Sequence, residues 1–314
     1  MTLEERIRGG LYGLLVGDAV GVPYEFNPPE KLPAYELIDI IPPQGFRSSY
    51  PHVDFGTWSD DGAQALCLLA SLIHCQKLDS TDLVNRFCNW YRAGYLAIDY
   101  KIFDIGIQTR EALERYLKGV ELSQIANADI NSNGNGALMR VLPLALWHKG
   151  SDIELIQDAF AQAHLTHAHI RSKLCCAIYC LWARNLIRGE SINSAWQISI
   201  ETIKTCFSEN DEVLNEIKFH IDLGLDYPVQ GKGYVVDCLL SAKYALAQST
   251  YQDVIKTAIA LGHDTDTTAC VAGGLAGIVF GEQAIPKAWK ASLKGQDIVE
   301  PLLNELLRQH KIIE

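Results

Sequence analysis

The sequence lacks any segment that could serve as a signal peptide or a transmembrane helix. Acidic residues occur early in segment 1–21, and glycines and Asp18 interrupt its apolar run. No other uncharged apolar run reaches the length needed to span a bilayer. We therefore expect a soluble, cytoplasmic protein that has no membrane partner.

Clusters of basic residues are also missing. The chain of 314 residues has 27 Lys and Arg against 38 Asp and Glu, which gives a net charge of −11. A nucleic-acid or anionic-membrane surface needs grouped positive charge, so we expect neither kind of partner. We expect the acidity mainly to support solubility, and we expect a monomer.

Paired cysteine motifs are absent as well, because none of the nine cysteines forms a CxxC pair. Most of them stand in apolar helical contexts, and Cys175, Cys176 and Cys180 share one such segment. An odd number of cysteines buried in helices favours reduced thiols in a cytosol over a disulfide framework, a redox site or a metal site.

Runs with the period of two expected for strands are missing, and so are fixed-period repeats and low-complexity linkers. Helical patterns instead recur along the chain, so we predict a single all-α domain spanning residues 1–314. Residues 27–57 hold six prolines and are predicted to form a long loop of the kind that acts as a lid or binding segment. The predicted helices cover 4–20, 62–75, 79–93, 106–118, 151–164, 170–188, 190–207, 209–223, 235–248, 251–261, 269–281 and 297–311.

Glycine is abundant in the first predicted helix, which carries Gly9, Gly10, Gly13, Gly17 and Gly21. Each glycine should weaken an isolated helix by about 1 kcal/mol, so their number indicates close packing against another element. The uncharged small-residue segment 269–281 is the expected partner.

Two acidic turns precede apolar helices far apart in the chain. Asp264 and Asp266 lie in the first turn, and Ser59 precedes Asp60 and Asp61 in the second. Each turn alone is typical of helix capping. Together the four aspartates could balance two divalent ions, with Ser59 and Thr267 as neutral oxygen ligands, and hard oxygen donors suit Mg, Mn or Ca better than Zn.

Three further motifs have both a structural and a functional interpretation. Asp104 precedes a predicted helix, where it either caps the helix or belongs to a site. The Asn- and Gly-rich loop 131–136 is a candidate phosphate cradle at a helix N-terminus, although Asn-Gly turns are common. His167 and His169 favour a substrate-contacting or structural role, because no other nitrogen or sulfur ligands are evident nearby.

These motifs together resemble the ADP-ribosylglycohydrolase family, and the resemblance covers nearly the whole chain. The matching segments, in chain order, are Gly17–Gly21 with Pro23–Glu25, Trp58–Asp61, Phe103–Gly106, Asn133–Arg140, Thr166–His167, Gly233–Val236 and Asp264–Thr268. The resemblance implies a compact, orthogonal multi-helix fold with a binuclear Mg or Mn centre in a cleft. It also implies hydrolysis of the glycosidic bond between ADP-ribose and a protein side chain, commonly arginine and in one branch serine.

The resemblance assigns roles to individual residues. The implied metal ligands are Ser59, Asp60, Asp61, Asp264, Asp266 and Thr267. The implied catalytic carboxylates are Glu25, Asp104, Asp61 and Asp266. The loop Asn133, Gly134, Asn135 and Gly136 would lie against the diphosphate, and the remaining substrate contacts would come from Met139, His167, Gly233, Tyr234 and His263.

Anomeric chemistry suits these residue types independently of the resemblance. Carboxylates stabilise an oxocarbenium-like state, and the reaction needs a positioned water and a protonated leaving group. Backbone amides can hold a diphosphate, which accounts for an acidic protein with an anionic ligand.

The chain departs from the family pattern at three positions. Ser59 stands where Thr is usual, Gly62 where Thr often follows the Asp pair, and His263 where Gly is usual. Arginine-linked ADP-ribose is the leading expected substrate. The alternatives are a hydrolase of serine-linked or small-molecule conjugates and a catalytically silent ADP-ribose binder.

Overall fold

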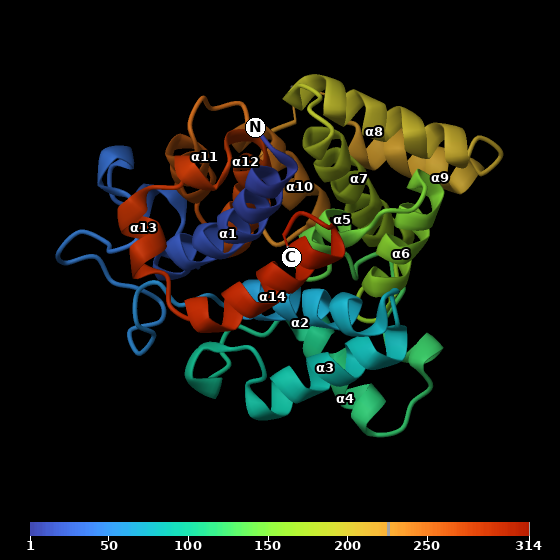
Figure 1. Cartoon of the computed structure of the whole chain (residues 1–314), viewed down its shortest axis with the longest axis horizontal. Helices are drawn as coiled ribbons and strands as arrows, with labels where there is room; N and C mark the ends of the chain where they lie inside the picture. Colours follow the sequence, from blue (N-terminus) through green and yellow to red (C-terminus); the bar gives the residue numbers. More distant parts are fainter. Residues whose placement is uncertain (225–226, 314) are drawn as a thin grey trace.

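The computed structural model describes residues 1–224 and 227–313, and within those ranges it contains α-helices and short helical turns but no β-strand (Figure 1). The predicted all-α fold is confirmed. The helices are α1 Leu3–Gly21, α2 Asp60–Cys75, α3 Ser80–Ala93, α4 Ile107–Leu117, α5 Leu142–Trp147, α6 Asp152–His164, α7 Ile170–Ile187, α8 Ile192–Cys206, α9 Asp211–Glu216, α10 Val235–Ala245, α11 Tyr251–Ala260, α12 Thr265–Phe280, α13 Lys287–Ser292 and α14 Gln296–Gln309.

Two helical details differ from the sequence prediction. The segment predicted as one helix over 209–223 is α9 followed by the π-helical turn Ile217–Ile221. The short helix α13 was not predicted, and α5 was given no predicted range, because each has only six residues, too few to show a helical period. Elsewhere, caps that the sequence indicates are formed, such as Asp79 at α3.

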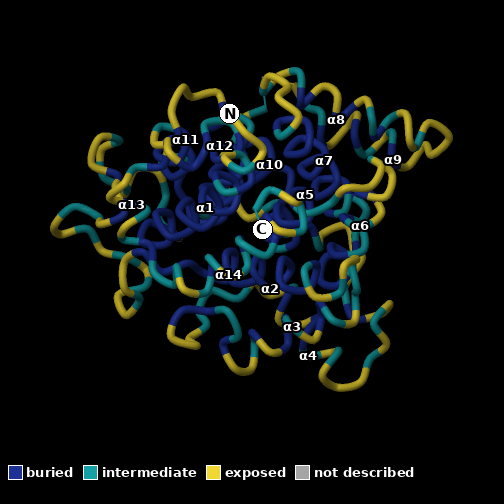
Figure 2. Tube along the Cα trace, in the orientation of Figure 1, coloured by how far each residue is buried: buried dark blue, intermediate teal, exposed yellow. Residues whose placement is uncertain are grey.

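The closest helix contact is the antiparallel packing of α1 against α12, which we call the glycine seam. It is formed by Gly9, Gly13, Gly17 and Gly21 of α1 against Gly277, Gly273, Ala269 and Asp266 of α12. A Cβ added at Gly9 would lie 2.1 Å from the carbonyl oxygen of Gly277, and one at Gly13 would lie 2.3 Å from that of Gly273. The two backbones therefore touch directly, as the glycine content predicted, and both helices are almost wholly buried (Figure 2).

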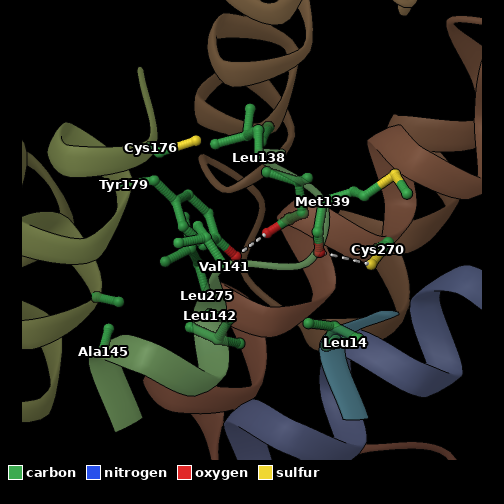
Figure 3. Close-up of a cluster of buried hydrophobic side chains, with 14 of the residues drawn as sticks. Leu14, Leu138, Met139, Val141, Leu142, Ala145, Cys176, Tyr179, Cys270 and Leu275 are labelled. Atoms are coloured by element: carbon green, nitrogen blue, oxygen red, sulfur yellow. Dashed lines mark hydrogen bonds between the residues drawn. The ribbon is translucent and has the colours of Figure 1, made fainter. Parts of the chain in front are cut away.

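Apolar side chains pack around this pair of helices. Figure 3 shows Leu14 of α1, Leu142 of α5, Tyr179 of α7 and Leu275 of α12 meeting in one cluster. The hydroxyl of Tyr179 donates to the carbonyl of Val271 at 2.8 Å, so this buried polar group is satisfied. The core thus fixes α12 from several sides at once.

The predicted loop over residues 27–57 contains only the short 3₁₀ turns Pro29–Lys31 and Tyr35–Leu37. It is nevertheless tied down, because the Tyr24 hydroxyl donates to the Asp39 carbonyl at 2.7 Å and accepts from the Asp39 amide. Ser49 Oγ also donates to the carbonyl of Glu25 at 2.7 Å. The loop is therefore held against the segment that carries Glu25.

Two expectations from composition can be compared with the described residues. None of their helices is both long enough and apolar enough to cross a bilayer. All nine cysteines are free, and most are buried in helices.

Candidate active site

The two acidic turns of the sequence lie side by side in the folded chain. The glycine seam brings the start of α12 next to the end of α1, and α2 begins beside them. Thr267 Oγ1 at the start of α12 donates to Asp61 Oδ2 of α2 at 3.4 Å, and Ser59 Oγ donates to the same oxygen at 3.1 Å. The side chains of residues 60–61 and 264–266 therefore converge.

A second group of carboxylates adjoins this pair of turns. One carboxylate oxygen each from Glu25, Asp104 and Asp266 lies within 4.8 Å of the other two. Glu25 follows the 3₁₀ turn Val22–Tyr24 and is 2% exposed. We call the six residues Glu25, Asp60, Asp61, Asp104, Asp264 and Asp266 the carboxylate cluster.

Asp104 does not cap α4, so the capping interpretation is wrong. Gly106 occupies the N-cap position, and no side chain caps the helix. Asp104 has a φ of 52°, in the left-handed region that costs non-glycine residues energy. The strained backbone of Asp104 therefore coincides with a carboxylate that lies beside those of Glu25 and Asp266.

Burial without positive partners raises the pKa values of the cluster. Desolvation and then the neighbouring Asp104 carboxylate raise the pKa of Glu25 to about 11. Burial is also the main cause that raises the pKa values of Asp60, Asp61 and Asp266 well above their usual range, with neighbouring carboxylates adding to it. In the described part of the chain, no Lys, Arg or His forms an ion pair with any cluster member.

Several oxygens of the cluster have no hydrogen-bond partner. Glu25 Oε2, Asp61 Oδ1 and Asp266 Oδ2 are buried and unpaired. Buried carboxylate oxygens without donors are costly unless a cation or a proton satisfies them. The donor set of carboxylates and the hydroxyls of Ser59 and Thr267 consists of hard oxygens, which fits a hard divalent cation.

Sequence reasoning missed Asp18 as part of this site. Asp18 is fully buried on α1 and accepts hydrogen bonds from the amides of Ser59, at 3.0 Å, and Gly62, at 2.8 Å. It therefore fixes the turn that presents Asp60 and Asp61. The available signal was a carboxylate inside an otherwise apolar, glycine-rich helix.

The carboxylate cluster opens into a cleft of about 570 Å³. Glu25, Asp60, Asp104 and Asp264 line it, whereas Asp61 and Asp266 are buried beside them. Phe26 lies at the cleft and is 65% exposed. The remaining described lining residues are Ile105, Gly106, Ile107, Gln108, Thr109, Asn131, Ser132, Gly134, Asn135, Gly136, Met139, His167, Gly233 and Thr267.

Tyr50 of the long loop is a second residue that sequence reasoning missed. Its ring lies 5.0 Å from that of Phe103 and 6.1 Å from that of Phe26, between ring centroids. Its hydroxyl lies near the carboxylates of Glu25 and Asp104. The loop predicted as a lid thus contributes an aromatic side chain beside the carboxylates.

The asparagine–glycine loop lines the cleft, but it does not start a helix. Helix α5 begins only at Leu142, so the expected helix N-terminus is not there. Two loop amides already have acceptors, since Gly134 N donates to Gln108 Oε1 at 2.8 Å and Asn135 N donates to the Gly233 carbonyl at 3.0 Å. The glycines are needed for space, because a Cβ at Gly136 would lie 2.9 Å from the His167 ring.

Three of the predicted substrate contacts do not line the cleft. The Asn133 side chain is held by the Ile130 carbonyl and the Ser172 hydroxyl. The Tyr234 hydroxyl accepts a hydrogen bond from Arg171 at 3.1 Å. His263 pairs through its backbone with Phe26 and Asn27.

The structure accounts for two departures from the family pattern. A Cβ at position 62 would lie 2.8 Å from Trp58, so glycine fits here because the Trp58 side chain fills the space. His263 has a φ of 62°, the left-handed conformation that glycine adopts without cost. His263 therefore has the backbone conformation that the usual glycine would adopt at this position.

A second pocket, of about 390 Å³, lies between α7, α8 and α10. Trp182, Trp196 and Lys243 line it, and it contains no carboxylate among its described residues. The presence of a pocket alone therefore does not identify the active site, whereas the carboxylate cluster does.

The helical fold and the cleft lined by carboxylates from separate parts of the chain define the class, an all-α glycohydrolase fold. A solved structure titled "ADP-ribosylglycohydrolase-related protein complex" superimposes with a TM-score of 0.76, at 28% identity and covering 98% of both chains. The family model for ADP-ribosylglycohydrolase matches residues 1–312, and the chain belongs to that family.

Similar proteins carry related names. An ADP-ribosylarginine hydrolase Tri1 from Serratia proteamaculans is 30% identical over 96% of this chain and 79% of its own length. An ADP-ribosyl-[dinitrogen reductase] glycohydrolase from Rhodospirillum rubrum is 28% identical over 93% of this chain and 91% of its own length. The ADP-ribosylhydrolase ARH3 from Bos taurus is 26% identical over 96% of this chain and 92% of its own length.

Proposed function

We propose that this protein is a metal-dependent hydrolase that cleaves the bond between ADP-ribose and a modified protein side chain, with ADP-ribosyl-arginine as its substrate. The observation that carries the proposal is the carboxylate cluster with its unpaired buried oxygens, opening into a cleft. The relatives named as arginine-directed hydrolases support the choice of arginine.

Two divalent ions, Mg or Mn, would be held by Ser59, Asp60, Asp61, Asp264, Asp266 and Thr267. When bound, such ions would neutralise the carboxylates, orient ribose hydroxyls and make a bound water more acidic. Asp18 would act indirectly, because it holds the backbone turn of Ser59 and Gly62 and so positions the adjoining ligands.

Glu25 and Asp104 are the carboxylates proposed for proton transfer and for stabilising positive charge at the anomeric carbon. Burial raises the pKa of Glu25 in the metal-free protein to about 11, and its Oε2 has no hydrogen-bond partner, so we assign the transferable proton to this side chain. A proton at that atom is available to the departing arginine nitrogen. Asp104 stands next to Glu25 and can stabilise an oxocarbenium-like state.

Uncharged donors would hold the nucleotide half of the substrate. None of the described residues lining the cleft is Lys or Arg, whereas Gln108, Asn135 and His167 line it. The phosphates would therefore contact neutral donors. The negative charge of the carboxylate cluster would be balanced by the divalent ions.

The direct test is release of ADP-ribose from arginine-modified and serine-modified protein, each with and without Mg or Mn. We expect release from the arginine conjugate only, and only with metal. Cleavage of the serine conjugate instead, or of a small-molecule ADP-ribose conjugate assayed alongside, would favour those alternatives. Binding of ADP-ribose without any cleavage would establish the silent binder.

Changing Glu25 to Gln should lower kcat by about 100- to 10,000-fold, because the neutral amide cannot transfer a proton. ADP-ribose affinity and the number of Mn ions bound should remain those of the wild type, as measured by calorimetry. Glu30→Gln is the matched control, since Glu30 is exposed in the same loop region. Wild-type turnover by Glu25→Gln would show that Glu25 is only a loop residue.

A further inference from the structure

Arg140 is a fully buried arginine whose guanidinium contacts no carboxylate among the described residues. Its donors go to neutral groups. Nε donates to Gln162 Oε1 at 3.1 Å, Nη1 to Gln64 Oε1 at 2.8 Å, and Nη2 to the Gln162 carbonyl at 3.1 Å and to Thr166 Oγ1 at 2.8 Å. The guanidinium carbon also lies 4.4 Å from the centre of the Phe87 ring. Burying a charged guanidinium without a carboxylate partner costs free energy of folding, so the role of its neutral partners needs an explanation.

One arm of this network ends at the carboxylate cluster. Because Arg140 can only donate, Gln64 must present its oxygen to Arg140 and its amide nitrogen to the other side. That nitrogen donates to Asp60 Oδ2 at 3.1 Å. Gln64 is completely buried one helical turn after Asp60, so its orientation cannot be satisfied by solvent. Arg140 thereby fixes one oxygen of Asp60 as an acceptor.

The other arm ends at His167. Thr166 Oγ1 accepts from Arg140 and lies 2.8 Å from His167 Nδ1. No other acceptor for the Thr166 hydroxyl is found in the described part of the chain. A proton on His167 Nδ1 would leave that buried hydroxyl without an acceptor, which is unfavourable. The hydroxyl therefore donates to Nδ1, and the ring proton of neutral His167 sits on Nε2.

His167 Nε2 faces the cleft at the glycine loop. Cβ atoms built at Gly134 and Gly136 would lie 3.4 and 3.3 Å from it. Burial, and next the charge of Arg140, lower the pKa of His167 to about 3, so the ring stays neutral over the physiological range. The cleft therefore contains one oriented, uncharged N–H donor at this place.

We propose that Arg140 is a positioning residue that couples the two halves of the cleft through the chain Asp60–Gln64–Arg140–Thr166–His167, and that it fixes His167 as an Nε2–H donor to an acceptor atom of the nucleotide. The second part rests on the proposed function, because it takes ADP-ribose as the ligand. The ligand atom at this place is a phosphate, ribose or ring acceptor. A ligand ammonium or other hydrogen-bond donor is excluded at this place, because Nε2 carries the ring proton and cannot accept a hydrogen bond.

Arginine is required at this position by geometry as well as by charge. Its planar group reaches both glutamines and Thr166 at once, whereas a lysine ammonium offers only three donors from one point. Arg140→Lys should therefore disturb Gln64 and Thr166 together, although the positive charge remains.

The deciding experiment is ¹⁵N NMR of the histidine side chains in the ligand-free protein, with the His167 signals identified by their loss in His167→Asn. We expect the pattern of a neutral ring protonated on Nε2, unchanged from pH 5 to pH 9. A ring protonated on Nδ1, or a ring that titrates near pH 6.5, would overturn the proposal. This measurement needs no substrate, so it stands apart from the success or failure of the proposed function.

Thr166→Val and Thr166→Ser form the matched pair for the ligand part. Valine removes the hydroxyl and keeps the shape, so His167 should lose its single tautomer. The Kd for ADP-ribose and the KM should then rise about 3- to 10-fold, with little change in kcat, as expected for one hydrogen bond. Serine keeps the hydroxyl and should remain within twofold of wild type. A valine variant with wild-type tautomer and affinity would contradict the proposal, and circular dichroism would verify that both variants fold.

Discussion

Asp266→Asn should abolish turnover and, at the same time, raise the melting temperature of the metal-free protein. Asp266 is fully buried, one of its oxygens is unpaired, and its neighbours Glu25, Asp104 and Asp61 are all acidic. Asparagine keeps the oxygen that accepts from the Thr267 amide at 2.8 Å but removes a charge that a cation would need. We expect kcat/KM to fall more than about 100-fold.

The stability gain should depend on pH in a defined direction. Burial raises the folded-state pKa of Asp266 well above the usual range of an aspartate, so the native protein holds this proton over a range where the unfolded chain has lost it. The stability of the metal-free wild type therefore falls as pH rises through that range, whereas asparagine does not titrate. The difference in melting temperature between Asp266→Asn and wild type, measured in EDTA, should be larger at pH 8 than at pH 5.

The matched control for this prediction is Asp99→Asn, because Asp99 is an exposed carboxylate. It should leave activity and the pH dependence unchanged. Added Mn should then stabilise wild type and Asp99→Asn more than Asp266→Asn. Full activity of Asp266→Asn, or a lower melting temperature in EDTA, would remove Asp266 from the proposed ligand set.

Gly277→Ala should destabilise the protein so strongly that little folded material is recovered. A Cβ at this position would lie 1.8 Å from the Gly9 carbonyl oxygen and 2.4 Å from its carbon. Both atoms belong to the backbone of α1, so no rotamer change can make room, and α1 and α12 must separate. We expect a loss of at least about 3 kcal/mol in the free energy of unfolding, measured by urea denaturation.

Gly106→Ala serves as the control for stability. Gly106 has a φ of −58°, and a Cβ there would meet only Thr109 Oγ1, at 3.9 Å. Its free energy of unfolding should change by less than about 0.5 kcal/mol. Equal effects of the two substitutions would show that the glycine seam is not the tight contact described above.

The architecture of the site could largely be predicted from sequence patterns. Glycines four residues apart in 4–20, together with the small-residue run after Thr267, indicated a close helix pair. Acidic turns before apolar helices indicated where carboxylates would gather. Both signals are local in the sequence, because helix periodicity and helix starts are set by neighbouring residues.

Other parts of the site could not be predicted, because they depend on contacts between distant segments. Asp18 looked like an interruption of an apolar helix, and only the fold shows the Ser59 and Gly62 amides around it. The position of Tyr50 is set by an irregular loop with no periodic signal. The loop at Gly134 looked like a phosphate cradle, but its amides are partly consumed by Gln108 and Gly233.

The glycine seam joins residues near the start of the chain to residues close to its end, and this has a consequence for protein synthesis. Until Phe280 has left the ribosome, the glycine face of α1 cannot pack against α12. The acids of the first sixty or so residues and those of α12 cannot meet before that moment. A prematurely terminated chain should therefore be an inactive, protease-sensitive product rather than a weakened enzyme.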